Sequence, residues 1–366
     1  MEHSELISRI RLIRTPTIGP ITSRQLISRY GNAKQALEAI PELSSRGGRK
    51  IQPASAASAQ REYEKLTQIG GYFIAYGSDS YPEHLKRFDD SLFILSCLGH
   101  MHLLKKPSLS IIGARNASLN SCKYAERISR ELGEQGYVVI SGMARGIDRS
   151  AHQGALISGT IAVLGNGIDI PYPSQNRDIY QTIKQSGLIL SEMPFGQNPA
   201  ARFFPQRNRI IAALSDGCLV IEAAFKSGSL ITASQAADRN VPVMAIPGSP
   251  LDPRAQGCNQ LISDGAYLVQ SVSEIISILS SPIIKSQDNL YQSDMLNDAS
   301  DYPEVKTEKA RNCIMENISH TPIDIDELLN WCHVSAQEIS AAILELELAG
   351  LIQRHYGNRI SQILSV

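Results

Sequence analysis

Seven short apolar runs alternate with helical segments between residues 108 and 270. In chain order they are SLSIIG, YVVISG, TIAVLG, LILSEM, GCLVIEA, VPVMAIPG and AYLVQ. Runs that are apolar at nearly every position are typical of strands buried on both faces, and the helices between them supply the crossovers that parallel strands need. The pattern predicts a Rossmann-like, doubly wound α/β fold with a mostly parallel sheet over about residues 108–280.

The segments that flank this core have different patterns. Residues 1–60 predict a small helical domain, and residues 61–107 are grouped with the core as one domain of residues 61–280. Residues 281–305 are acidic and polar, which predicts a flexible linker. Residues 306–366 predict helices followed by a short strand hairpin, the pattern of a winged helix. The net negative charge of this last segment favours a protein-interaction role over DNA binding.

Composition places the chain among ordinary globular proteins. It has 366 residues, of which 43% are hydrophobic and 19% charged. No stretch approaches the roughly 20 apolar residues of a membrane span, and the first residues lack the apolar core of a signal peptide. The six cysteines are scattered and form no C-x-x-C pair, so we expect neither a disulfide framework nor a zinc site, and a cytoplasmic location. His100 and His102 have no third ligand nearby in sequence and are interpreted as part of a polar loop.

Cations follow several of the predicted strands. Arg115, Arg145 and Lys226 each come shortly after a strand, and Arg207 and Arg209 come after the fourth strand. Between residues 108 and 280, 11 of the 14 cations are arginine, whose planar fork suits bidentate phosphate contacts. Because the carboxyl ends of parallel strands meet at one edge of a sheet, these cations are expected to surround an extended, phosphate-bearing ligand.

The segment FFPQRNRIIAALSDG at residues 203–217 raises a question of its own. Pro205 predicts a helix start, which places Arg207 and Arg209 in the first turn, where the helix dipole is already positive. The segment contains no acid before Asp216. Pairing with carboxylates elsewhere in the chain would explain one such arginine, but for two an external anion is the better interpretation.

Two other kinds of site are weighed against this one. A dinucleotide site is not supported, because Gly165-Asn166-Gly167 lacks the third glycine of G-x-G-x-x-G. A hydrolase is not supported either, because no nucleophile in a strained elbow accompanies Asp148 and His152. We interpret Asp148 as a helix cap or ion-pair partner, and His152 as a packed or capping histidine.

Several motifs resemble the DNA-processing protein A (DprA, or Smf) family. In order they are SIIGARNAS, SGMARGIDRSAHQGAL, TIAVLGNGIDIPYP, LSEMPFG, FFPQRNRIIAALSD, EAAFKSGSLITASQAADRNVPVMAIPG and GCNQLISDGA, which cover most of residues 108–270. YGSDSYPEHLKRFDD is similar to the segment that precedes the Rossmann-like domain of the family. The ends of the chain resemble its sterile-alpha-motif-like (SAM-like) domain and its winged helix, with weaker motifs.

The resemblance implies a protein, not an enzyme, that binds single-stranded DNA in natural transformation and recombination. Such a protein protects incoming strands, helps to load the recombinase RecA, works as a homodimer in the cytoplasm, and uses no cofactor or metal. Phe204, or alternatively Phe203, would stack on a base. The DNA-binding residues implied are Gly113, Arg115, Gly142, Arg145, Gly146, Phe204, Arg207, Asn208, Arg209, Lys226, Ser227, Gly228, Ser229 and Thr232. Many relatives have lysine where Arg145 stands, which preserves the charge but changes the contact geometry.

The main rival function is enzymatic. Nucleotide phosphoribohydrolases of related families share a Rossmann-like core but carry a P-G-G-x-G-T turn followed by a glutamate. Here the corresponding stretch is KSGSLITASQAA, which lacks both the turn and the acid needed for proton transfer at a glycosidic bond. A third possibility is a scaffold whose pocket holds oligonucleotides no better than other polyanions.

Overall fold

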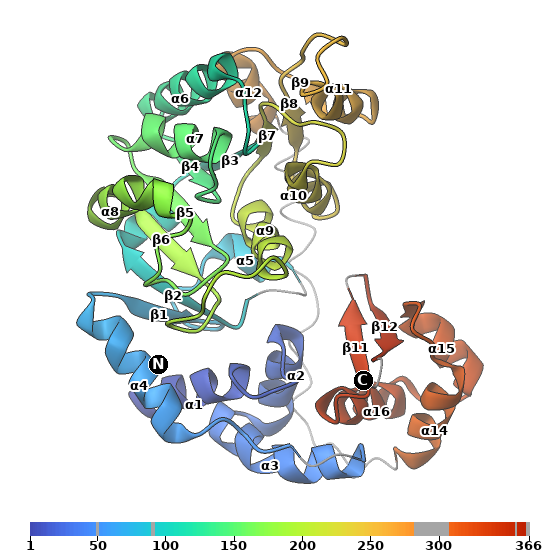
Figure 1. Cartoon of the computed structure of the whole chain (residues 1–366). Helices are drawn as coiled ribbons and strands as arrows, with labels where there is room; N and C mark the ends of the chain where they lie inside the picture. Colours follow the sequence, from blue (N-terminus) through green and yellow to red (C-terminus); the bar gives the residue numbers. More distant parts are fainter. Residues whose placement is uncertain (49–50, 89–91, 282–306, 356, 364–366) are drawn as a thin grey trace. The chain divides into compact units, whose positions relative to one another are not determined.

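The computed structural model describes residues 1–48, 51–88, 92–281, 307–355 and 357–363 (Figure 1). They form two compact units. The first contains residues 1–61, a short segment at 92–94 and the described residues from 307 onward; the second contains residues 62–88 and 95–281. Apart from Ser281, the expected linker at residues 281–305 lies outside the described residues.

The N-terminal part of the first unit is helical, as predicted. Its helices are α1 (His3–Ile13), α2 (Pro20–Tyr30), α3 (Ala33–Arg46) and the start of α4 (Ala56–Gln68). α2 begins at Pro20, whose missing N–H costs nothing in a first turn. The Asn32 side chain caps α3 by accepting a hydrogen bond from Gln35 N at 2.9 Å. Fully buried side chains such as Leu26 and Ile40 form the core between these helices.

A nine-stranded sheet forms the centre of the second unit. Its strands are β1 (Tyr72–Ala75), β2 (Ile94–Gly99), β3 (Ser108–Ile112), β4 (Val138–Ser141), β5 (Thr160–Leu164), β6 (Leu188–Ser191), β7 (Cys218–Val220), β8 (Val243–Ala245) and β9 (Tyr267–Leu268). Their order is β1-β2-β6-β5-β4-β3-β7-β8-β9. Neighbours from β6 to β9 pair in parallel, whereas β2 pairs antiparallel with β6. All seven apolar runs form strands, so the predicted mostly parallel, doubly wound sheet is confirmed.

The strand order reverses at β3. From there the chain builds β4, β5 and β6 on one side, and it then returns to place β7, β8 and β9 on the other side (Figure 1). The connections that leave the carboxyl ends of the neighbouring strands β3 and β7 therefore run in opposite directions. In open α/β sheets, ligands bind outside the carboxyl ends of the strands at such a reversal.

Helices cover the sheet and fix the positions of the loops. They are α5 (Glu83–Lys86), α6 (Leu119–Glu134), α7 (Ile147–Ala155), α8 (Arg177–Ser186), α9 (Phe203–Ala213), α10 (Gly228–Ala237), α11 (Gln256–Ser263) and α12 (Val272–Leu279), with short 3-10 helices at Met101–Lys105 and Ser174–Asn176. One apolar cluster packs Ile128 of α6 and Ile275 of α12 against Val139 of β4. A second packs Ile183 of α8 against Ile189 of β6.

The C-terminal part has the predicted winged-helix pattern. Its elements are α14 (Glu308–Asn317), β10 (Ile323–Asp324), α15 (Ile325–Cys332), α16 (Ala336–Leu348), β11 (Ile352–His355) and β12 (Arg359–Gln362). The strands pair antiparallel in the order β10-β12-β11. A capping box between Ser335 and Glu338 starts α16, and side chains such as Ile314, Ile339 and Ile360 form one core.

This part also contains a disulfide, which the scattered cysteines, expected to form no disulfide framework, did not indicate. Cys313 on α14 bonds to Cys332 at the end of α15. Packing of the two helices brings their Cα atoms to 5.9 Å, within the range that a disulfide spans. The two cysteines are 19 residues apart in the sequence, and their pairing could not be predicted from it because the pairing depends on how the two helices pack.

Candidate functional site

Five connections at the carboxyl ends of the parallel strands form what we call the rim. They are residues 113–118 after β3, 142–146 after β4, 165–173 after β5, 192–209 after β6 and 222–229 after β7. Three cations selected from the sequence, Arg115, Arg145 and Lys226, are exposed on it. Arg202, which the sequence analysis did not select, is exposed as well.

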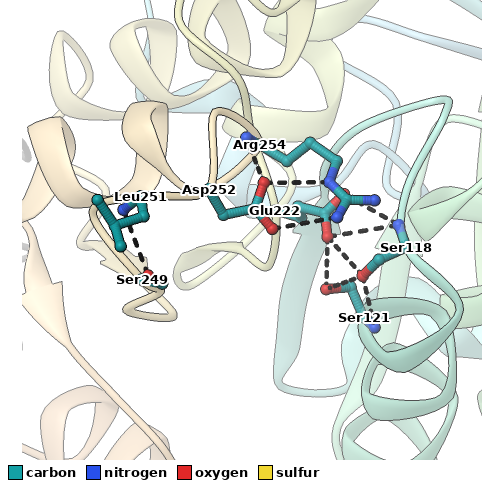
Figure 2. Close-up of polar contacts among 7 residues, drawn as sticks. All are labelled: Ser118, Ser121, Glu222, Ser249, Leu251, Asp252 and Arg254. Carbon is teal, nitrogen blue, oxygen red and sulfur yellow. Dashed lines mark hydrogen bonds and ion pairs between the residues drawn. The ribbon is translucent and has the colours of Figure 1, made fainter.

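Glu222 anchors the loop of Arg115 at both ends. Its main-chain carbonyl accepts a hydrogen bond from Ala114 N at 2.7 Å, and its carboxylate accepts bonds from Ser118 N at 3.0 Å and Ser118 Oγ at 2.7 Å. Ser121 Oγ donates to the same carboxylate at 2.7 Å (Figure 2). Glu222 is only 6% exposed, so these donors replace the water that its carboxylate loses.

A solvent-exposed ion pair lies beside this cluster, on the connection after β8. Arg254 donates to both carboxylate oxygens of Asp252, at 3.2 and 3.1 Å (Figure 2). The hydrogen bond to Asp252, together with the negative charges of Asp252 and Glu222, raises the pKa of Arg254. Next to it, Leu251 N donates to Ser249 Oγ at 3.3 Å. An exposed ion pair of this kind adds little to stability.

The loop of Arg145 packs against the loop of Arg115. Gly146 has a φ of 71°, and a Cβ there would lie 2.3 Å from Ala114 O, so both the backbone angle and the close approach require glycine. Ile147 N donates to Ala114 O at 3.3 Å. A Cβ on Gly113 would lie 2.6 Å from Ile147 Cγ1. The structure therefore brings Arg115 and Arg145 together on two loops in direct contact.

Arg207 lies underneath the rim. It is 5% exposed, and its Nη1 donates to Val163 O at 2.7 Å. A Cβ on the buried Gly142 would lie 2.0 Å from Nη1, so this glycine makes room for the guanidinium. Burial lowers the pKa of Arg207 to about 10, while the negative charge of Asp148 acts in the opposite direction. Arg207 thus supports the loops of the rim from below, through its contacts with Val163 O and Gly142.

These positions correct the interpretation of the first-turn arginines. α9 begins at Phe203, two residues earlier than predicted, so Arg207 and Arg209 lie beyond its first turn. Arg209 Nη2 lies 2.7 Å from both carboxylate oxygens of Glu192. Both arginines therefore have acidic neighbours inside the protein, and an external anion is not required to explain them. The pairing with Glu192 is a tertiary contact that the local sequence did not reveal.

An aromatic cluster accompanies the cations. The Arg115 guanidinium lies 5.4 Å from the ring centroid of Phe204, and the Tyr172 ring stacks on Phe204 with centroids 5.8 Å apart and planes at 26°. Arg202 lies 4.9 Å from the centroid of the neighbouring Phe203. Phe204 therefore contacts Arg115 and Tyr172 on the rim. Tyr172 was missed, although its position between two prolines after β5 was a local sign of an ordered aromatic.

The start of α10 adds small polar groups. Lys226 has a φ of 69° and is exposed, and Ser227 caps the helix by accepting from Ser229 N at 3.4 Å. The hydroxyls of Ser227 and Ser229 lie 2.8 Å apart, and Gly228 is exposed. Thr232 is only 2% exposed, so its hydroxyl lies below the surface. Asn208, on α9, is half-buried.

Asp148 and His152 are internal, and the prediction that His152 is a packed residue is confirmed. Asp148 accepts hydrogen bonds from Gly142 N and Ala144 N, both at 3.2 Å, and burial raises its pKa. His152 is fully buried, with Nδ1 2.8 Å from Thr160 Oγ1. Thr160 uses its own proton to donate to Val139 O, so His152 Nδ1 is the donor in this hydrogen bond. Burial, and secondarily the charge of Arg207, lower the pKa of His152 to about 3.

Two further features of the described residues bear on the kind of protein. Within the described ranges, no group of three or more His, Cys, Asp or Glu side chains is arranged to hold a metal ion. Among the helices that the structure describes, none combines the length and apolar character of a membrane span.

The fold and the rim define a class of protein. It is a doubly wound α/β protein with an arginine-rich, aromatic-lined sheet edge, whose chain also contains an N-terminal helical part and a C-terminal winged helix. The chain belongs to the DNA recombination-mediator protein A family, whose model matches residues 72–280. Models for the DprA-like N-terminal HHH domain and the DprA winged helix domain match residues 3–64 and 299–358. The resemblance noted in the sequence is thereby confirmed.

Relatives of known identity agree with this assignment. Protein Smf of Synechocystis is 29% identical over 98% of this chain and 99% of its own length. The X-ray structure of DprA from Streptococcus pneumoniae is 38% identical, with a TM-score of 0.57 over 61% of this chain and 77% of that one. A structure of DprA from Helicobacter pylori, described for its single-stranded DNA binding mode, is 32% identical, with a TM-score of 0.52 over 57% of this chain and 95% of that one.

The buried histidine generates a prediction about stability. We expect the free energy of unfolding to fall as the pH falls below about 6.5, because the unfolded chain then takes up a proton at His152 that the folded chain binds only near pH 3. Asp148 acts in the opposite direction, because its raised pKa makes the folded chain take up a proton first. Urea unfolding of the wild type and of His152→Asn at several pH values separates the contribution of His152 to the pH dependence from that of Asp148. The variant should lose stability less steeply on acidification, and parallel curves would contradict the assignment.

Proposed function

We propose that this protein binds single-stranded DNA at the rim without sequence preference. The observation that carries the proposal is the presence of three exposed cations on the rim, Arg115, Arg145 and Lys226, of which Arg115 lies over the ring of Phe204. Cations of this kind bind phosphates, and an aromatic ring stacks on any base because every base has a π-face. The site offers no arrangement of side chains specialised for the edges of paired bases.

The structure supports dividing the expected site residues into two groups. Residues at the surface are proposed to contact DNA directly, and deeper residues are proposed to hold the rim in shape. The direct group is Gly113, Arg115, Arg145, Gly146, Phe204, Asn208, Lys226, Ser227, Gly228 and Ser229. The deeper group is Gly142, Arg207, Arg209 and Thr232, because these residues are buried or already paired with protein groups.

The biological role proposed is DNA processing in natural transformation and recombination. The chain would protect incoming strands and help to load the recombinase RecA onto them, in the cytoplasm where that recombinase acts. Support comes from membership of a family named for DNA recombination mediation, and from the DprA of Helicobacter pylori, whose structure was described for single-stranded DNA binding.

An enzymatic function fits the rim less well. Transfer of a proton at a glycosidic bond needs an accessible acid, and the glutamate nearest to the Arg115 loop is Glu222. Its carboxylate already accepts hydrogen bonds from Ser118 and Ser121. We therefore propose a binding protein, and incubation with AMP should release no free base.

The rim proposal predicts which substitutions weaken DNA binding. Arg115→Ala and Lys226→Ala should each raise the dissociation constant for a labelled single strand about 10-fold, a loss of roughly 1.4 kcal/mol. Each should also reduce the slope of log K against log salt by about 0.7, the value expected for one lost phosphate contact on a single strand. Fluorescence anisotropy at several salt concentrations measures both quantities.

A matched control is available on α6. Arg127 is an exposed arginine whose side chain lies over Tyr124 and within 3.7 Å of Glu131. Arg127→Ala removes the same charge from the sheet domain without touching the rim, so its affinity and salt slope should match the wild type. Equal losses in Arg127→Ala and Arg115→Ala would point to attraction by overall charge. Failure of the wild type to bind single strands would overturn the proposed function.

Glu222 provides a second prediction, because it holds the loop of Arg115 and lies below the surface. Glu222→Gln removes the charge and one acceptor for the serine donors, so the loop should loosen and the affinity for single strands should fall several-fold. In an Arg115→Ala background the same substitution should change little, since the two effects share one loop. Additive losses in the double variant would show that Glu222 does not act through Arg115.

A homodimer is proposed as the active form. β9 is the last strand of the sheet, and its Tyr267 and Leu268 are 49% and 48% exposed, an apolar edge available for a second copy. Tyr267→Glu/Leu268→Glu should therefore lower the mass in light scattering from a dimer to a monomer. It should also weaken the loading of RecA onto strands coated with a single-strand-binding protein. An unchanged mass would place the contact between copies elsewhere.

A further inference from the structure

We propose that Tyr172 is the residue on which a nucleobase of single-stranded DNA stacks, with Phe204 acting as its support. This inference rests on the proposed function and refines it, since the family resemblance implies stacking on Phe204 or Phe203. Tyr172 lies on the connection after β5, at the rim, and its ring packs on Phe204 with centroids 5.8 Å apart and planes at 26°.

Phe204 already has neighbours on several sides. The Tyr172 ring stacks on it, the Arg115 guanidinium lies 5.4 Å from its centroid, and a Cβ added to Gly165 would lie 3.0 Å from its Cδ1. The side chain is half-buried as a result. A base that stacked on Phe204 would have to displace one of these groups. The ring of Phe204 is therefore better suited to hold other groups in place than to receive a base.

Tyr172 has the accessible surface that Phe204 lacks. It is 42% exposed, although one side of its ring packs on Phe204. The contact with Phe204 covers one side of the ring, and we place the base on the other side. A base stacked there would extend the existing pair into a three-ring stack, an arrangement that tolerates any base.

The backbone around Tyr172 is held in place, so stacking of a base would cost little conformational entropy. Pro171 and Pro173 restrict φ on both sides of the tyrosine. Before it, the Asn166 side chain donates to Gly167 O at 3.0 Å and Ile170 O at 2.7 Å. A ring that is already fixed loses less conformational entropy on binding than a mobile one.

The segment from Pro171 to Asn176 contacts the loops of the cations that would bind the phosphates. The side chain of Asn176, three residues beyond Pro173, donates to Met143 O at 2.8 Å and Ala144 O at 3.0 Å, immediately before Arg145. On the other side, Phe204 contacts both Tyr172 and Arg115. The segment that would hold the base is thus bonded to the loop of Arg145 and packed, through Phe204, against Arg115.

The test compares two ligands on the full chain. One is a labelled oligothymidylate, and the other is an oligomer of the same length that carries the sugar-phosphate backbone without bases. Tyr172→Ala should weaken oligothymidylate binding about 10-fold and leave binding of the base-free oligomer unchanged. Tyr172→Phe should bind both ligands like the wild type, because stacking needs the ring and not the hydroxyl.

Trp331→Ala serves as the control. Trp331 is another exposed aromatic, at 71%, but it lies on α15 of the winged helix. Its loss should change binding of neither ligand. A measurement on the wild type guards against misfolding of the alanine variant: irradiation of a strand that contains 5-bromodeoxyuridine, followed by mass spectrometry, should place the cross-link on Tyr172.

The possible outcomes distinguish this inference from the proposed function. Equal losses on both ligands in Tyr172→Ala, no loss on oligothymidylate, or a cross-link on Phe204 alone would overturn the stacking role of Tyr172 while leaving DNA binding at the rim intact. If the wild type bound neither ligand, the proposed function and this inference would both fail.

Discussion

The buried guanidinium of Arg207 connects most of the rim. It donates to Val163 O at the end of β5, fills the space that Gly142 leaves open after β4, and lies near the carboxylate of Asp148. Asp148 in turn accepts hydrogen bonds from Gly142 N and Ala144 N. The loops that carry the exposed cations rest on these two buried groups, because Arg207 contacts the strand end before one loop and Asp148 binds the backbone of another.

The arginines of the sheet domain thus have two separate tasks. Arg207 and Arg209 use their charge inside the protein, against Asp148 and Glu192, whereas Arg115 and Arg145 present theirs to solvent. The count of cations in a sequence does not distinguish these tasks. Burial does, because a guanidinium removed from water needs a protein acceptor and has little left to offer a ligand.

Much of the fold was predictable because its signals are local. Apolar runs identified all seven parallel strands, and the rule that ligands bind at the carboxyl ends of such strands brought Arg115, Arg145 and Lys226 to one edge. The start of α9 was placed late because proline fits more than one position in a first turn. The pairing of Arg209 with Glu192, the stack of Tyr172 on Phe204 and the disulfide of the winged helix were missed, since each joins segments that only the folded chain brings together.

Glu222 has a consequence for the kinetics of binding. Its carbonyl and its carboxylate accept hydrogen bonds from the two ends of the Arg115 loop. The segment between Ala114 and Ser118 is therefore ordered in the absence of a ligand. A loop closed in advance has no ordering step to complete during an encounter. Capture of a strand should then proceed in a single kinetic phase, at a rate governed by diffusion and by the attraction between the exposed cations and the approaching phosphates.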